Sequence, residues 1–358
     1  SFPFLTINFI IIFIVSMSIT HIFLDFVPSI YLGAPDDSGL SVMPGHSLLL
    51  QGKAHQAVIY TLSGCLCGIL ISILVFPFLL YFLPITYPYF QKFMPLILFW
   101  AIIFLISNEK QSKLWAIIIF ILAGFLGICS MNLNIKEPLL PLLSGLFGSS
   151  TLIYSISQKT KIPQQTLEKI NINKKQLIKP ALSSALISPI CSFLPGLGSS
   201  QAAVISSEIS GKQTKEQFLF LLGSVNIITM SLSFAALYII NKARTGSAAA
   251  INQLTQLTLS NLFTIAIAII ISSLIAFFLA LKLSKIFAKN ITKLNYSKIS
   301  IITLIIITSI VIYFSGFFGF LIFSVSTLVG ILAIITNIRK AHLMGSLLIP
   351  TILFYLPF

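Results

Sequence analysis

The chain contains three aspartates, and all of them lie close together near its start. Asp25 falls within an apolar run, where an ionisable group is costly and therefore suggests function, unless it marks a helix end near the interface. Asp36 and Asp37 follow a Gly-x-Pro break and precede Ser38 and Gly39. Two adjacent carboxylates beside unwound backbone can bind a coupling cation, Na+ for instance, or carry a proton. The alternative is a solvated turn that caps the next helix.

A proline-glycine turn inside an apolar segment gives the sharpest signal for ligand binding. Its residues are Pro195, Gly196, Leu197, Gly198, Ser199, Ser200 and Gln201, followed by two alanines. Small residues let the backbone approach a ligand, and the hydroxyl and amide groups add neutral hydrogen bonds. A half-helix beginning near Ser199 directs its positive dipole end and its free N–H groups at an anion. The alternative is a packing kink at a helix crossing.

Arg244 is one of only two arginines, and Thr245 and Gly246 follow it. A guanidinium group can hold a carboxylate or a phosphate through two parallel hydrogen bonds. We therefore expect Arg244, Thr245 and Gly246 to bind an anionic substrate, with an ordinary surface loop as the alternative. Asn226 is a lone polar residue in apolar sequence, which predicts either a place in the same site or a bond to a neighbouring helix.

Motifs of known catalytic sites do not occur in the sequence. There is no H-E-x-x-H, no G-x-S-G with a histidine partner and no P-loop. His46 and His55 lie near the aspartates, but a metal site needs more ligands at defined spacing, so we interpret both as loop residues. We expect neither an enzyme nor a metal or organic cofactor, apart from a coupling Na+ or H+.

The composition places these residues in a membrane. Of the 358 residues 57% are hydrophobic and 8% are charged, and the mean hydropathy is +1.02. Soluble domains carry about 25% charged residues, so a soluble enzyme, a nucleic-acid-binding domain and a disordered chain are excluded. We predict an all-α polytopic membrane protein with about ten transmembrane helices. Apolar segments are expected at 3–33, 57–82, 94–107, 114–130, 138–156, 180–205, 218–240, 259–281, 299–314, 316–336 and 343–357.

The net charge of +14 comes largely from lysines in short loops between apolar runs. The loops 157–179, 282–298 and 337–342 are strongly basic, and the last contains Arg339, Lys340 and His342. Basic loops are retained on the cytoplasmic side, so we expect all three to be cytoplasmic and to contact anionic lipid headgroups and not nucleic acid.

The segment 180–205 decides the topology. Three full crossings between the loops 157–179 and 282–298 would leave one of them outside. If 180–205 enters the membrane and returns on the same side, both loops are cytoplasmic. Its prolines and glycines make one straight helix unfavourable, so we predict a re-entrant hairpin. The same parity puts 34–56 inside and 241–258 outside.

Those two stretches resemble each other, because Tyr31 matches Tyr238 and Ser38-Gly39 matches Thr245-Gly246 at one common offset. Two halves of opposite orientation form an inverted repeat, a common architecture of secondary transporters. We predict a first membrane repeat at 1–156, a basic cytoplasmic loop at 157–179 and a second repeat at 180–358 that begins with the hairpin. A matching hairpin before residue 3 is missing, so we expect an N-terminally incomplete chain.

Five stretches of the chain carry a family resemblance: 27–36, 43–52, 193–203, 237–246 and 342–351. Over nearly its whole length the sequence resembles the large permease subunit of tripartite tricarboxylate transporters, closest to a shorter archaeal branch. The resemblance implies a multi-pass permease that imports carboxylates with a cation gradient. It also implies a small membrane subunit and an extracytoplasmic binding protein as partners, although this chain is shorter than the bacterial permeases.

We therefore predict a secondary transporter in the cell membrane that carries small organic anions, di- or tricarboxylates, coupled to a sodium or proton gradient. The hairpin tip, Asn226 and Arg244 would bind the substrate, while Asp36 and Asp37 with Ser38 and Gly39 would serve the cation. Two alternatives are a carrier of polyprenyl-phosphate-type lipid-linked anions and a non-transporting membrane scaffold.

The topology prediction can be tested by labelling. In a variant without the native cysteines, a cysteine placed at Lys175 and one placed at Lys289 should both react only from the cytoplasmic side. Reaction from opposite sides would mean that 180–205 crosses the membrane once, and the inverted-repeat hypothesis would be wrong.

Overall fold

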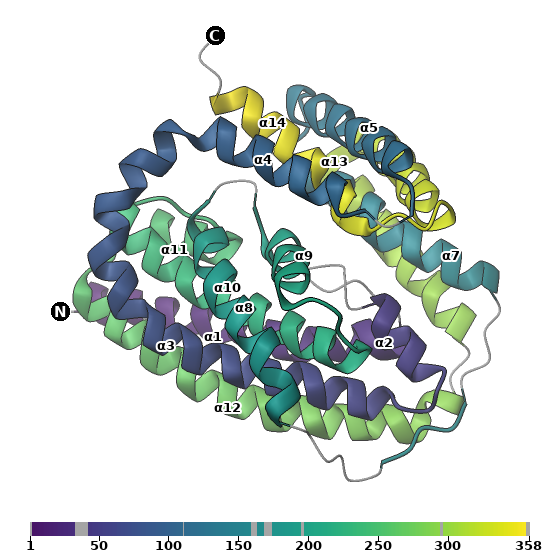
Figure 1. Cartoon of the computed structure of the whole chain (residues 1–358), viewed down its shortest axis with the longest axis horizontal. Helices are drawn as coiled ribbons and strands as arrows, with labels where there is room; N and C mark the ends of the chain where they lie inside the picture. Colours follow the sequence, from purple (N-terminus) through teal and green to yellow (C-terminus); the bar gives the residue numbers. More distant parts are fainter. Residues whose placement is uncertain are drawn as a thin grey trace. The chain divides into compact units, whose positions relative to one another are not determined.

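The computed structural model of the chain describes residues 2–32, 42–109, 111–158, 163–167, 174–194, 197–293 and 296–355. Within these ranges every regular element is a helix, which confirms the all-α class (Figure 1). The chain forms two compact units. Unit 1 comprises Ser1–Tyr31, Asp36–Lys92 and Gln165–Lys289, and unit 2 comprises Leu32–Pro35, Phe93–Gln164 and Asn290–Phe358. Because each unit is assembled from separate parts of the chain, the predicted division into sequence repeats stays a prediction.

Among the described residues, six helices are long and apolar enough to cross a membrane: α1 (Phe2–Leu32), α3 (Ala54–Lys92), α5 (Lys113–Asn132), α10 (Lys215–Ile240), α12 (Leu259–Asn290) and α13 (Tyr296–Ile335). The 40 residues of α13 are interrupted at Gly316, whose φ of 64° is not helical. This break separates two of the apolar segments expected from the sequence. The polytopic class is therefore confirmed, and the count of about ten crossings stays a prediction.

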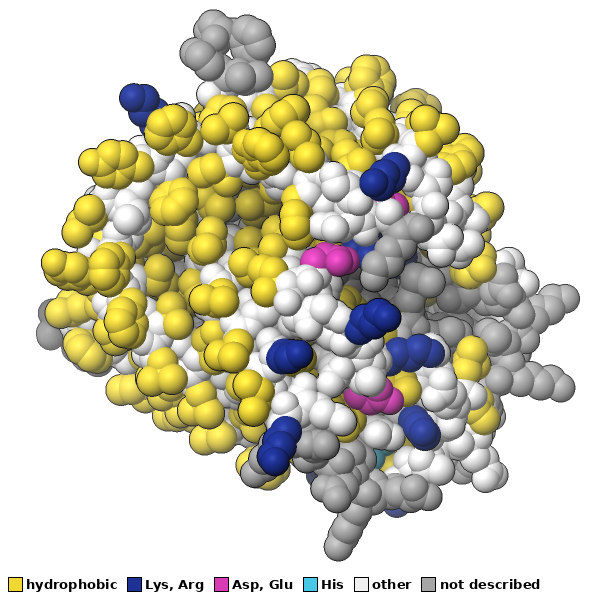
Figure 2. All heavy atoms as spheres, in the orientation of Figure 1, with side chains coloured by type: hydrophobic (Ala, Val, Ile, Leu, Met, Phe, Trp, Pro, Cys, Tyr) yellow, Lys and Arg dark blue, Asp and Glu magenta, His cyan; other side chains and the backbone are white. Residues whose placement is uncertain are grey.

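Large apolar side chains cover the outside of these helices. Leu74 is 69% exposed, Phe278 67% and Tyr313 83%. Figure 2 shows hydrophobic side chains over much of the face that it presents. Apolar surface of this extent is typical of contact with lipid.

Unit 1 also contains α2 (Val42–Leu49), α8 (Lys174–Phe193), α9 (Ser199–Ser210) and α11 (Gly246–Leu254). Its long helices form two parallel pairs. Asn8 at the start of α1 accepts a hydrogen bond from Asn261 at the start of α12, and Tyr31 near the end of α1 donates to the Ser284 carbonyl near the end of α12. α1 and α12 therefore run side by side in the same direction.

The second parallel pair is α3 and α10, which cross at glycines. A Cβ atom on Gly64 would lie 2.0 Å from the Phe220 carbonyl oxygen, and one on Gly223 would lie 2.0 Å from the Thr61 carbonyl oxygen. The two backbones are thus in direct contact, as small residues permit in membrane helices. Nearly all of α10 is buried inside unit 1, from Leu219 to Leu237.

The two helix pairs meet at an end that we call the Ser284 end. There the Ser284 hydroxyl lies 2.8 Å from Nδ1 of His55, the second residue of α3. His55 is thus a buried helical residue and not the loop residue expected from the sequence. α1 and α12 end where α3 and α10 begin, so the two pairs run in opposite directions.

The predicted hairpin is a pair of helices, α8 and α9, separated by a break at 194–198. They fold back on each other: Ser210 at the end of α9 donates to the Lys179 carbonyl near the start of α8, and its hydroxyl lies 2.6 Å from that of Ser183. Gln217 at the start of α10 donates to the Gln176 carbonyl. The chain therefore leaves the hairpin at the Ser284 end, where it entered. Whether this hairpin is re-entrant in a membrane stays a prediction.

Unit 2 contains α5, α13, α4 (Met94–Ser107), α6 (Leu139–Leu143), α7 (Ser150–Gln158) and α14 (Gly345–Tyr355), together with η1 (Ser144–Ser149), which is a π-helix, and η3 (Lys340–Met344). Glycines again let backbones touch. A Cβ atom on Gly127 of α5 would lie 1.9 Å from the Ser346 carbonyl oxygen of α14, and one on Gly330 of α13 would lie 2.3 Å from the Leu146 carbonyl oxygen of η1. Ser149 in η1 pairs with the Thr327 hydroxyl of α13 at 2.5 Å.

The glycine crossing predicts a specific stability change. Gly64→Ala should lower the unfolding temperature of the purified protein, because overpacking of this kind costs about 1–3 kcal/mol. Gly246→Ala is the matched control, since a Cβ atom there meets nothing within 4 Å. Equal melting curves for the two variants would contradict direct backbone contact between α3 and α10.

Candidate functional site

The hairpin tip presents the start of α9. Gly198, the residue before the helix, is exposed, and a Cβ atom on it would meet only Oε1 of Gln201, at 3.6 Å. That oxygen accepts the Gly198 backbone N–H at 2.9 Å. The Gln201 side chain is 0% exposed, and its Nε2 has no hydrogen-bond partner. The tip therefore combines a helix N-terminus with a buried amide donor that is unsatisfied within the described residues.

The other predicted residues of the tip divide into two groups. Leu197 and Ser200 are buried, and Ser199 is half-buried at the first position of α9. Pro195 and Gly196 lie outside the described residues.

Arg244 lies in the turn between α10 and α11 and is half-buried. Its Nη2 donates to the Tyr87 hydroxyl of α3 at 3.1 Å, and its Nε is buried without a hydrogen-bond partner in the described part of the chain. The Lys242 ammonium lies 5.6 Å from the centre of the same tyrosine ring. Two cations thus converge on Tyr87, and one of them keeps a buried donor for a further acceptor.

Thr245 and Gly246 build the start of α11. The Thr245 hydroxyl accepts the Ala248 backbone N–H at 3.2 Å and pairs with the Ser233 hydroxyl of α10 at 3.0 Å. Thr245 therefore caps the helix and fixes the turn that carries Arg244. Gly246 is exposed with open space around its Cα.

The hairpin tip and Arg244 are fastened to the same turn of α3. Phe193, the last residue of α8, packs against Phe90 with ring centroids 5.5 Å apart. Phe90 follows Tyr87, the partner of Arg244, by three residues, which places the two on one helix face roughly 5 Å apart along the axis. The structure thus brings two predicted substrate-binding regions, distant in sequence, to one part of unit 1.

The remaining predicted residues are placed less closely. Asn226 is 4% exposed in the middle of α10, which packs against α8 and α9. Asp25 is half-buried within α1. Asp36, Asp37, Ser38 and Gly39, the predicted cation site, lie outside the described residues.

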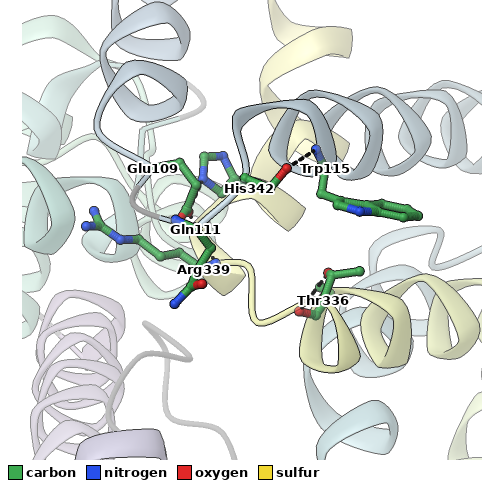
Figure 3. Close-up of polar contacts among 8 residues, drawn as sticks. Glu109, Gln111, Trp115, Thr336, Arg339 and His342 are labelled. Carbon is green, nitrogen blue, oxygen red and sulfur yellow. Dashed lines mark hydrogen bonds and ion pairs between the residues drawn. The ribbon is translucent and has the colours of Figure 1, made fainter.

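Unit 2 contains a buried ionic cluster that sequence reasoning missed (Figure 3). His342 Nε2 lies 2.9 Å from Oε2 of Glu109, and the Lys340 ammonium donates to the Thr151 hydroxyl at 2.7 Å. The sequence predicted Lys340 and His342 in an exposed basic loop, but both are buried. Glu109 and His342 are far apart in the chain, so no local pattern indicates the pair.

Burial lowers the pKa of the His342 imidazole below its ordinary value. The hydrogen bond and charge of Glu109 act in the opposite direction, and the charge of Arg339 lowers the pKa further. The imidazole is therefore neutral at neutral pH, and its neutral form is the one that contacts Glu109.

Apolar helices packed through glycines, together with a helix pair broken at a proline-glycine turn, define a polytopic membrane protein of transporter type.

The chain belongs to the tripartite tricarboxylate transporter TctA family, whose sequence model matches residues 2–345. This confirms the family inferred from the sequence, and it makes the protein a membrane transporter, since the family is one of transporters and not of enzymes. Members normally work in a tripartite system with substrate-binding and small membrane subunits.

A relative in Methanocaldococcus jannaschii, the uncharacterized protein MJ1079, is 30% identical over 368 aligned positions, which cover 99% of this chain and 90% of that protein. No solved structure matches the chain.

The geometry around Arg244 generates a graded prediction. Arg244→Lys should weaken anion binding, because an ammonium cannot reproduce the planar fork, and Arg244→Gln should weaken it further. A charge-assisted hydrogen bond contributes about 1.5–3 kcal/mol, so the dissociation constant should rise roughly ten- to a hundredfold. Thermal-shift titration with carboxylates measures this. Unchanged affinity in both variants would remove Arg244 from the site.

Proposed function

We propose that the protein is a secondary transporter of small organic anions, di- or tricarboxylates, driven by a sodium or proton gradient. The observation that carries the proposal is the attachment of the hairpin tip and Arg244 to one turn of α3 through Phe90 and Tyr87. Both regions hold buried nitrogen donors without partners among the described residues, Nε2 of Gln201 and Nε of Arg244.

The chemistry of these donors suits a carboxylate. An ionised carboxylate only accepts hydrogen bonds and has room for about four of them. The first turn of α9 offers free backbone N–H groups with a positive dipole end, Gln201 offers a neutral donor and Arg244 offers a charged one. The exposed Gly198 leaves the space that close approach of a ligand requires. Asn226, Thr245 and Gly246 are the further members that we propose for this site.

The order of the elements supports an inverted repeat. In α1, α2 and α3 a long helix, a short helix and a long helix follow one another, and the same order recurs in α10, α11 and α12. α1 runs parallel to α12 and opposite to α3 and α10, so corresponding helices of the two series point in opposite directions. We propose the boundaries 1–156 and 180–358 for the repeats, about ten crossings and a re-entrant α8–α9 hairpin.

The proposed mechanism is alternating access. A substrate at the broken helices would be exposed to either side by movement of one repeat against the other. Asp36 and Asp37, with Ser38 and Gly39, are the proposed site of a coupling cation. The protein would lie in the cell membrane with its basic loops cytoplasmic, and a small membrane subunit and an extracytoplasmic binding protein are its proposed partners.

A second candidate function is transport of a lipid-linked phosphate. Unit 1 has a cavity of about 120 Å³ between α3, α10 and α12. Its lining is apolar and includes Ile69, Leu232 and Ile265. A polyprenyl chain would fit such a surface, while its phosphate would use the same donors as a carboxylate. The carboxylate proposal ranks first because the family is that of tricarboxylate transporters.

Uptake into proteoliposomes tests the proposal. Labelled citrate or succinate should accumulate under an inward sodium or proton gradient and should not accumulate without one. Gly198→Val should abolish uptake with normal yield, because the tip is open and the added side chain occupies the ligand space. Movement of polyprenyl phosphate without carboxylate uptake would favour the second candidate, and transport of neither would favour a scaffold.

A further inference from the structure

Two connecting segments of unit 2 hold an acid and a base buried side by side. One segment, 108–112, joins α4 to α5, and the other, 336–344, leads from α13 into α14. Glu109 and His342 meet between them at 2.9 Å, with exposed fractions of only 6% and 1% (Figure 3). Ionisable groups are costly in an apolar membrane protein, so a buried pair of this kind indicates a function.

The hydrogen bonds show that Glu109 is the ionised partner. Its Oε1 accepts the Gln111 backbone N–H at 3.2 Å, and its Oε2 accepts that of Arg339 at 3.4 Å. Backbone donors on both oxygens stabilise the carboxylate form. Because a carboxylate only accepts, Nε2 of His342 must donate to it.

The second ring nitrogen of His342 is then open to a proton. In a neutral imidazole with hydrogen on Nε2, Nδ1 carries a lone pair. Nδ1 is buried and has no hydrogen-bond partner within the described residues. Protonation there would leave the Nε2–H bond to Glu109 in place and would change the charge of the pair from −1 to 0.

Few other charges bear on the ring. Arg339 precedes it on the same segment, and Lys340 is occupied with Thr151. α4 contains no titratable residue. The titratable residues of the other elements that pack against η3 are Lys113 and Cys129 of α5, Lys298, Tyr296 and Tyr313 of α13, and Tyr355 of α14. Lys113 is exposed and Lys298 lies at the far end of α13, so Glu109 is the acid that governs His342.

We infer that Glu109 and His342 form a proton-binding site, and that a proton on Nδ1 is linked to release of the segment 336–344 from Glu109. The inference rests on the proposed transport function and names the proton as its coupling ion. Nδ1 is closed off from water in this arrangement, so the proton taken from water can reach it only when the segment moves. Binding and movement are thereby coupled, as a gradient-driven cycle requires.

The direction of the coupling follows from the burial. Burial lowers the pKa of His342 in the seated arrangement, while a histidine released into water titrates near its ordinary value of about 6.5. The seated arrangement is therefore favoured above that pH and loses its advantage as the pH falls through it. A proton from the acidic side of the membrane would release the segment.

Nitrogen NMR of the full-length protein in lipid nanodiscs, labelled on histidine, tests the site directly. Only four histidines give signals, and His342→Gln assigns the one of interest. At neutral pH the His342 ring should carry hydrogen on Nε2, and Nδ1 should gain a proton on acidification. Glu109→Gln should lower the midpoint of that titration, because it removes the stabilising charge. The signal of His55, which bonds to a serine in unit 1, should not change and is the internal control. A hydrogen on Nδ1 at neutral pH, or one midpoint in both proteins, would overturn the inference.

Transport tests the coupling. With the membrane potential clamped, a proton gradient of one pH unit should support about tenfold accumulation of substrate for each coupled proton. His342→Gln and Glu109→Gln should lose this accumulation. Thr336→Val is the matched control in the same segment and should keep it, since Thr336 bonds only to its own helix in the recorded contacts.

The outcomes separate the inference from the proposed function. If the wild type carries no anion under any gradient, the proposed function fails and the NMR titration alone decides the proton site. If transport occurs and its proton response survives in His342→Gln but is lost in the double variant Asp36→Asn and Asp37→Asn, the aspartates bind the proton and the inference is wrong.

Discussion

Direct contact between the backbones of α3 and α10 is the constraint on which unit 1 depends. Gly64 and Gly223 each leave room for a carbonyl oxygen of the opposite helix, and no larger residue would allow that separation. Within lipid, helices gain nothing by hiding apolar side chains from water, so close van der Waals packing must hold them together. The crossing makes α10 the buried centre of the unit, with the hairpin against it. The other end of α3 then supplies Tyr87 and Phe90, which fasten Arg244 and the hairpin tip.

Much of the fold could be predicted from the sequence, because hydropathy and helix-breaking residues act locally. The break between α8 and α9 falls at the predicted proline-glycine turn, and the interruption of α13 at Gly316 falls between two predicted segments. Arg244 stood out because arginine is rare in this chain. Its partner Tyr87 did not, since α3 continues beyond its apolar run through three prolines to Lys92. Nothing local indicates that a tyrosine in that extension meets a loop far along the chain.

The basic segment before α14 shows where charge counting fails. A lysine and a histidine in a short loop predict a solvated, cytoplasmic position. That rule concerns which side of the membrane a loop occupies, and it contains no information on whether the side chains are buried. Lys340 and His342 are buried because Thr151 and Glu109 satisfy them, and those partners lie in other connections of unit 2. The predicted cation site at Asp36 and Asp37 lies outside the described residues, so it stays a prediction.

The π-helix η1 has an evolutionary consequence. A π-turn holds one residue more than an α-turn, and such turns arise when a residue is inserted into an existing α-helix. Deleting one residue between Ser144 and Ser149 would restore the α-helix but rotate everything beyond it by about 100°. Thr151 would then turn away from Lys340 and leave a buried ammonium without that hydroxyl. Relatives of this protein should therefore tolerate substitutions in η1 more readily than changes in its length, and a gap there in a descendant would indicate a lineage that has also lost the lysine.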